Sequence, residues 1–137
     1  MGIIGFDARH YQPLLKHSVI ALRAAGATSF GSERMIYFLG GVDNWLFNNF
    51  NNEVPLPNPN DAIAFQALAT NMRGFNLNIR NGNSYVVTNL ELRMPVFKYL
   101  SKRLQSPFLR SFQLVGFFDM GTAWEGPSPY SEDNPLN

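Results

Sequence analysis

The sequence predicts an all-β fold: a partial antiparallel transmembrane β-barrel of about five strands, with one long loop folded into its lumen. Three observations lead to this prediction. Apolar and polar residues alternate with a period of two over several segments. The connections between these segments are very unequal in length, which is typical of membrane barrels. The loop motif Met72–Phe75 also precedes two strand motifs, Asn89–Arg93 and Phe117–Gly121, so a loop arginine is followed by one carboxylate on each of two strands.

The alternation is sharpest from Tyr85 to Met94, where Glu91 and Arg93 share one side and mostly apolar residues share the other. In the last strand, Asp119 falls on the more polar side, and Trp124 falls where the aromatic girdle of a barrel belongs. Proline and glycine mark the ends of the earlier segments. We expect strands at about residues 3–12, 18–30, 34–39, 84–97 and 109–125.

The connection over about residues 40–83 is far longer than a structureless loop in a compact domain should be. It contains the stretches Asn48–Asn52 and Pro55–Asn60, whose composition favours turns and irregular backbone. Within it, Asp61–Ala69 is expected to form a short helix with Asp61 as its N-cap.

Composition excludes several functional classes. The net charge is only +1 and 15% of the residues are charged, whereas nucleic-acid binding favours a basic stripe, so we expect no nucleic-acid partner. The chain has no Cys, and His10 and His17 lack a spaced set of metal ligands, so we expect no metal. Gly40 and Gly41 are not followed by a helix or lysine that could cradle a phosphate. We therefore expect no catalytic residue, no cofactor and no enzymatic activity.

The two ends of the sequence indicate an excerpt. The N-terminus lacks the pattern of a secretory signal, and no apolar run approaches the roughly 18 residues of a membrane-spanning helix. Residues 128–135 are rich in turn formers, and the sequence stops two residues later. We expect a longer polypeptide, with any export signal upstream.

The order of four motifs resembles the bacterial surface antigen superfamily, which includes BamA and is similar to the two-partner secretion porins. The motifs are Tyr37–Gly41, Met72–Phe75, Asn89–Pro95 and Phe117–Trp124, and the resemblance covers roughly residues 6–125. The chain departs from many family members because residues 42–71 separate the first two motifs. This insertion looks most like that of large members in which a β-propeller precedes the barrel.

The resemblance implies a sixteen-stranded barrel in the bacterial outer membrane that assists outer-membrane protein assembly or polypeptide translocation. Its implied partners are outer-membrane lipid and unfolded outer-membrane or secreted polypeptides. It also implies that the arginine of a lumen-folded loop contacts acidic residues on the strands that follow. Carried over by motif, the residues of this structural loop clamp are Arg73, Gly74, Phe75, Glu91, Asp119 and Gly121.

The chemistry of the clamp can be stated from the residues themselves. The guanidinium of Arg73 offers planar donors that can serve carboxylates on two strands at once. Gly74 permits either a close backbone approach or a positive φ, and Phe75 can pack on the inner wall. Glu91 and Asp119 have the parity of the polar face in the predicted strands.

Two other functions remain compatible with the same pattern. One is a surface-exposed structural or adhesive barrel whose Asn- and Pro-rich loop binds an extracellular partner. The other is a soluble β-sandwich binding module, because a soluble sheet with one wet face also alternates with a period of two.

Overall fold

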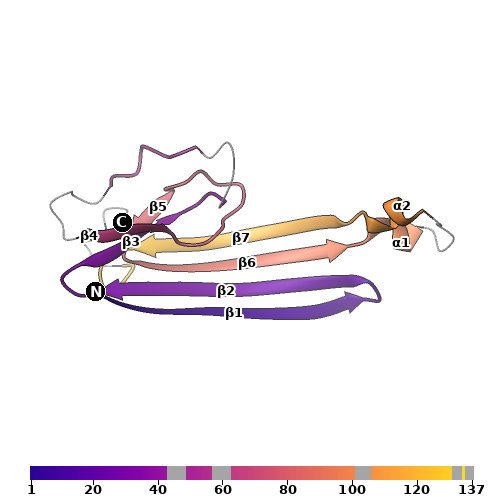
Figure 1. Ribbon diagram of the computed structural model, residues 1–137, viewed down its shortest axis with the longest axis horizontal. Coiled ribbons are helices and arrows are strands. Elements are labelled where there is room, and N and C mark those ends of the chain that lie inside the picture. The colour runs from indigo at the N-terminus through magenta and orange to yellow at the C-terminus, as the bar shows by residue number, and fades with distance from the viewer. Residues whose placement is uncertain (43–48, 57–62, 101–105, 131–133, 135–137) are drawn as a thin grey trace.

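Two sheets, one long and one short, form the molecule. The computed structural model describes residues 1–42, 49–56, 63–100, 106–130 and 134. The long sheet has the order β1 (Gly2–Leu15), β2 (Ser18–Phe30), β6 (Ser84–Met94) and β7 (Leu114–Trp124), with all neighbours antiparallel. In the described residues this sheet is open, with β1 and β7 at its edges (Figure 1).

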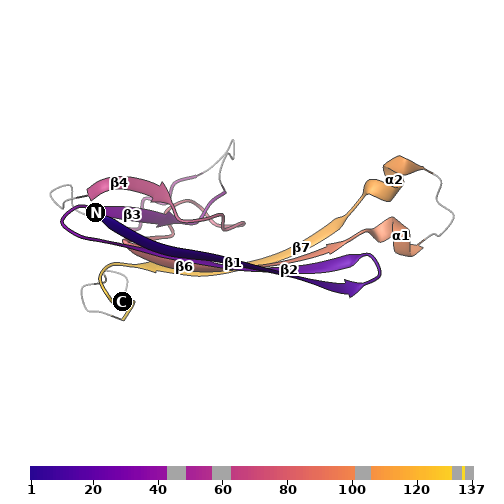
Figure 2. The same ribbon diagram turned by 60° about the horizontal axis from the view of Figure 1, so that its bottom comes forward.

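The short sheet has the order β4 (Ile63–Leu68), β3 (Arg34–Leu39) and β5 (Arg80–Gly82). Strand β3 pairs in parallel with β4 and antiparallel with β5. Figure 2 shows β3 and β4 as a second layer over one end of the long sheet. The opposite end carries two short helices, α1 (Val96–Leu100) and α2 (Pro107–Ser111). Neither described helix is long and apolar enough to cross a bilayer.

The register of the long sheet separates its residues into two faces. One cross-strand row aligns Arg9, Arg23, Asn89 and Asp119, and we call their side of the sheet the ion-pair face. The other side, the apolar face, is mostly hydrophobic and largely exposed. Its exposed hydrophobic residues include Ile4, Phe6, Leu22, Val86, Leu90, Leu114, Phe118 and Met120.

A small core joins the two sheets on the ion-pair side. Leu39 of β3, Met72 of the loop, Val87 of β6 and Ala123 of β7 are all buried and packed together. Ala69, Ile79 and Tyr85 pack around them. The second layer therefore rests on the end of the ion-pair face where its residues become small and apolar.

The predicted all-β class is confirmed in part: the described residues are mostly β-strand with an antiparallel sheet of four strands, but they also include two short helices, and several boundaries differ. Strand β1 extends through Pro13 to Leu15, because an edge strand tolerates a proline and its pairing is irregular there. The predicted strand 84–97 stops at Met94, since Pro95 leads into α1. The predicted strand 109–125 begins at Leu114, because Pro107 starts α2.

The predicted helix over 61–69 is wrong. Residues Ile63–Leu68 form strand β4, and Asp61 lies outside the described residues. Pairing with β3 supplies hydrogen-bond partners along this segment, which outweighs its local helix propensity. The connection over 40–83 is correspondingly not structureless: it contains β4 and β5 and the isolated bridges Gly41–Met72 and Phe50–Leu77.

We predict that Gly121→Ala destabilises the fold while Gly116→Ala, on the same strand, does not. A Cβ at Gly121 would lie 2.7 Å from Cγ2 of Val87 and 3.1 Å from the sulfur of Met72, whereas a Cβ at Gly116 would meet nothing within 4 Å. Overpacking of this kind costs about 1–3 kcal/mol. Urea-induced unfolding of the two variants measures the difference, and equal stabilities would contradict the packing argument.

Candidate functional site: an arginine clamp between the loop and the sheet

Three hydrogen bonds and one apolar contact hold the loop segment that leads to the clamp. Nη1 of Arg23 donates to Oγ1 of Thr70 at 2.8 Å, and Nδ2 of Asn89 donates to the carbonyl oxygen of Asn71 at 3.1 Å. Met72 follows in the core, and its backbone N–H donates to the carbonyl oxygen of Gly41. Successive loop residues are thus attached to β2, to β6 and to Gly41, just after β3.

Arg73 then bridges the last two strands of the long sheet. Its backbone N–H and Nε donate to Oδ2 of Asp119 at 2.8 and 3.0 Å, and Nη2 donates to Oδ1 at 3.0 Å. Nη1 donates to Oε2 of Glu91 at 2.6 Å. The guanidinium carbon also lies 4.3 Å from the ring centroid of Phe117. One arginine therefore contacts both predicted carboxylates and one aromatic ring.

The two carboxylates are not equivalent. The Asp119 side chain is fully buried and also accepts a hydrogen bond from Nδ2 of Asn89. The Glu91 side chain is partly exposed and also binds Nε of Arg93. The hydrogen bonds from Arg73 to Asp119, and secondarily those to Glu91, raise the pKa of the arginine although its partial burial lowers it. Asp119 is the main anchor of the clamp and Glu91 the lesser one.

The other predicted clamp residues have different roles. Gly74 adopts a φ of +85° with nothing near its Cβ position, so it permits a sharp turn rather than a close approach. Phe75 is exposed and does not pack on the sheet; Met72 occupies that place. Gly121 lies under Met72, where a larger residue would collide.

A second ion-pair group on the same face escaped assignment from the sequence. Asp7 of β1 binds Arg9 at 3.0 Å and Arg23 at 2.7 Å. Asp7 and Arg9 are two residues apart and so share one side of β1, but nothing local in the sequence indicates that Arg23 of the next strand joins them. Asn89 was missed as well, although it opens the motif that contains Glu91.

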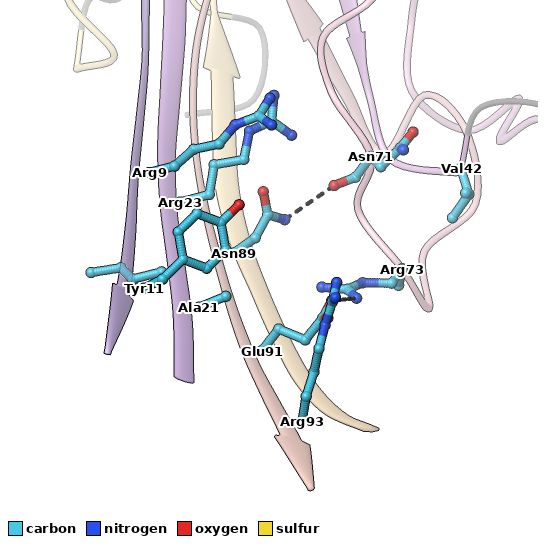
Figure 3. Close-up of a pocket in the computed structure, with 11 residues that line it drawn as sticks. Arg9, Tyr11, Ala21, Arg23, Val42, Asn71, Arg73, Asn89, Glu91 and Arg93 are labelled. Atoms are coloured by element: carbon cyan, nitrogen blue, oxygen red, sulfur yellow. Dashed lines mark hydrogen bonds and ion pairs between the residues drawn. The ribbon is translucent and has the colours of Figure 1, made fainter. Parts of the chain in front are cut away.

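A pocket of about 260 Å³, lined by both charged and apolar side chains, lies between the two ion-pair groups and the loop. Figure 3 shows Arg9, Arg23 and Tyr11 reaching it from β1 and β2, and Val42, Asn71 and Arg73 reaching it from the loop side. No group of three His, Asp or Glu residues in the described ranges could hold a metal ion. The ion pairs and hydrogen bonds around the pocket position the loop on the long sheet and brace it there.

Comparison of the chain with protein-family models, with curated proteins and with solved structures finds no match in any of the three.

We predict that Asp119→Asn releases the loop more than Glu91→Gln does. Removing the charge of a buried, paired carboxylate costs about 3–5 kcal/mol, whereas the partly exposed Glu91 contributes about 1 kcal/mol. Limited trypsin digestion followed by mass spectrometry measures loop release as the rate of cleavage after Arg73, under conditions in which the rest of the protein stays folded. Faster cleavage in Glu91→Gln than in Asp119→Asn would contradict this ranking.

Exchanging charges between positions 73 and 91 alone is not expected to restore the clamp. In the double variant Arg73→Glu with Glu91→Arg, the introduced carboxylate would face Asp119, which provides most of the contacts to this side chain. Arg73→Lys is expected to behave like a partial loss, because the single nitrogen of a lysine lacks the planar, spread donors with which the guanidinium reaches both carboxylates. Hydrogen–deuterium exchange at the backbone amides of loop residues 70–75 distinguishes these variants, because Arg73→Glu removes the trypsin site at this position.

Proposed function

We propose that the long sheet is an arc of the wall of an outer-membrane β-barrel of the bacterial surface antigen type, with the loop of the clamp folded into the lumen. The protein would then act in outer-membrane protein assembly or polypeptide translocation. Its partners are outer-membrane lipid and unfolded polypeptide clients.

The observation that carries this proposal is the location of the second layer. In a water-soluble two-layer protein, the second layer covers the apolar face of a sheet. Here the short sheet rests on the side that carries the ion pairs, while Phe118 and Met120 on the apolar face are 61% and 59% exposed. Lipid outside and a polar lumen inside account for this inverted arrangement.

Strand length also supports the proposal. Strands β1, β2, β6 and β7 have 14, 13, 11 and 11 residues. A tilted strand needs about 9–11 residues to cross a bilayer. Because an open sheet edge cannot be satisfied in lipid, β1 and β7 would pair with further strands in a closed barrel.

In this proposal the clamp has a mechanical role. Arg73 attaches the loop to β6 and β7 from within, so the loop narrows the lumen and braces one part of the wall. Bracing of this kind leaves other strand pairs free to separate and admit a client strand. The clamp itself performs no bond chemistry.

We predict that Phe118→Glu blocks stable membrane insertion and that Val115→Glu does not. Phe118 lies on the apolar face, where a charge would be placed in lipid, whereas Val115 lies on the ion-pair face directly opposite Arg93. Heat-modifiable electrophoresis of the outer-membrane fraction, in cells producing the natural protein that carries this chain, measures folded barrel. In a soluble sandwich the same Phe118→Glu change would be neutral or would improve solubility, so that result would overturn the proposal.

The cellular role is tested by depletion. If the protein assembles outer-membrane proteins, its depletion lowers the folded amounts of unrelated barrels in the envelope. If it translocates polypeptides, depletion instead lowers particular secreted proteins and leaves the barrels unchanged. Reintroducing the wild-type and Asp119→Asn forms shows whether the clamp is needed. Unchanged amounts of both folded barrels and secreted proteins after depletion would contradict the assigned role.

An adhesive barrel is the second candidate, favoured by the exposed side chains of Leu56 and Phe65 on the loop. Deleting the loop would also remove β4, so point changes are the cleaner test. Leu56→Ser with Phe65→Ser should abolish binding to an extracellular surface while leaving heat-modifiability unchanged. Unchanged surface binding would eliminate this candidate.

A further inference from the structure

We propose that the turn region at the helical end of the long sheet is a docking surface for anionic phospholipid headgroups. This surface comprises the β1–β2 turn together with α1 and α2, and the inference rests on the proposed function. Figure 1 places α1 and α2 at the end opposite the short sheet. The surface is defined by the residues Lys16, His17, Lys98, Tyr99, Leu100, Phe108, Arg110 and Phe112.

Acidic and basic residues are distributed unevenly along the sequence, and the fold of the long sheet places them toward different ends. No Asp or Glu occurs between Asp7 and Glu33, or between Glu91 and Asp119. These two intervals hold three and five, respectively, of the eleven Lys and Arg residues. Arg9, Arg23 and Arg93 of these intervals pair with carboxylates in the sheet, which leaves Lys16, Lys98 and Arg110 as the described basic residues near the turns at the helical end.

The described basic side chains of this surface are available to a ligand. Lys16, Lys98 and Arg110 are all exposed. The arginines of the ion-pair face are, in contrast, engaged by carboxylates: Arg9, Arg23, Arg73 and Arg93. Among the described residues, those of the helical end are therefore best able to attract an anionic surface.

Large apolar side chains accompany these charges. Leu100 is 73% exposed and Phe108 is 70% exposed. Phe108 packs edge-to-face on Phe112 with ring centroids 5.1 Å apart, yet this contact leaves most of Phe108 uncovered. Phe112 lies two residues before Leu114, which belongs to the apolar face, so the apolar surface continues from the sheet into the turn region.

The two turns are joined, which makes them one surface. The hydroxyl of Tyr99 accepts a hydrogen bond from the backbone N–H of His17 at 3.2 Å and lies 2.8 Å from Oγ of Ser18. The rings of His17 and Tyr99 lie 6.1 Å apart. Lysine and arginine beside exposed leucine and phenylalanine, at the edge of an apolar wall, is the composition of a membrane-interface anchor.

The opposite end of the sheet has a different chemistry. There, the described charged residues are Glu33, Glu53 and Glu125 together with Arg34 and Arg80, and Glu125 pairs with Arg34 at 3.1 Å. The difference between the two ends also specifies an orientation: the helical end lies against the phospholipid leaflet and the loop end faces away from it.

The test measures retention of phosphatidylglycerol and of phosphatidylcholine by the natural protein in detergent micelles, using native mass spectrometry. Wild type is expected to retain phosphatidylglycerol preferentially. Lys98→Gln with Arg110→Gln should lower this preference about tenfold, because each basic residue at such a surface contributes substantially to binding. The matched control is Arg34→Gln with Arg80→Gln, which removes two charges at the loop end and should keep the preference.

The apolar part of the surface is tested separately. Leu100→Ser with Phe108→Ser should lower retention of both lipids alike and leave the preference unchanged. Equal retention of the two lipids by wild type, or an unchanged preference in Lys98→Gln with Arg110→Gln, would overturn the inference. Heat-modifiable electrophoresis of the same samples reports on the barrel independently, so equal retention of the two lipids by a folded wild-type barrel rejects this surface and leaves the proposed function standing.

Discussion

The pairing of Arg73 with Asp119 determines where the second layer lies. A carboxylate enclosed as completely as that of Asp119 is costly unless a cation and hydrogen-bond donors reach it, so the loop must return to this point whenever the sheet forms. The three residues directly before the arginine, Thr70, Asn71 and Met72, also contact the sheet or its core. Chain connectivity thus converts one ion pair into the position of a whole loop.

The clamp also explains why the loop can lie on a charged face. Each described charge in the middle of that face is paired: Asp7 with Arg9 and Arg23, and Arg73 with Asp119 and Glu91. Further toward the loop, the same face becomes small and apolar and supports the core. An arrangement with ion pairs inside and exposed phenylalanines outside is coherent in a lipid environment, where the solvent for the outer face is apolar.

Charge polarity along the strands adds a second level of organisation. The charged side chains in the middle of the sheet are held in ion pairs, and Lys16, Lys98 and Arg110 lie near its turns. Basic turns at one end and acidic loops at the other would orient a barrel in a membrane whose two sides differ. The clamp and the charge difference are independent features. The clamp joins the loop to neighbouring strands, whereas the charge difference lies between the two ends of the strands.

The sequence by itself determined the long strands and their faces, because alternation is a local property: the parity that puts Glu91 and Asp119 on one side can be read from each strand alone. It also identified Arg73 as their partner through motif order. Only the tertiary structure decided that residues 63–68 form a strand rather than a helix, and that Met72 rather than Phe75 packs inward. Those outcomes depend on β3 and Gly121, which are distant in sequence and supply the missing hydrogen bonds and space.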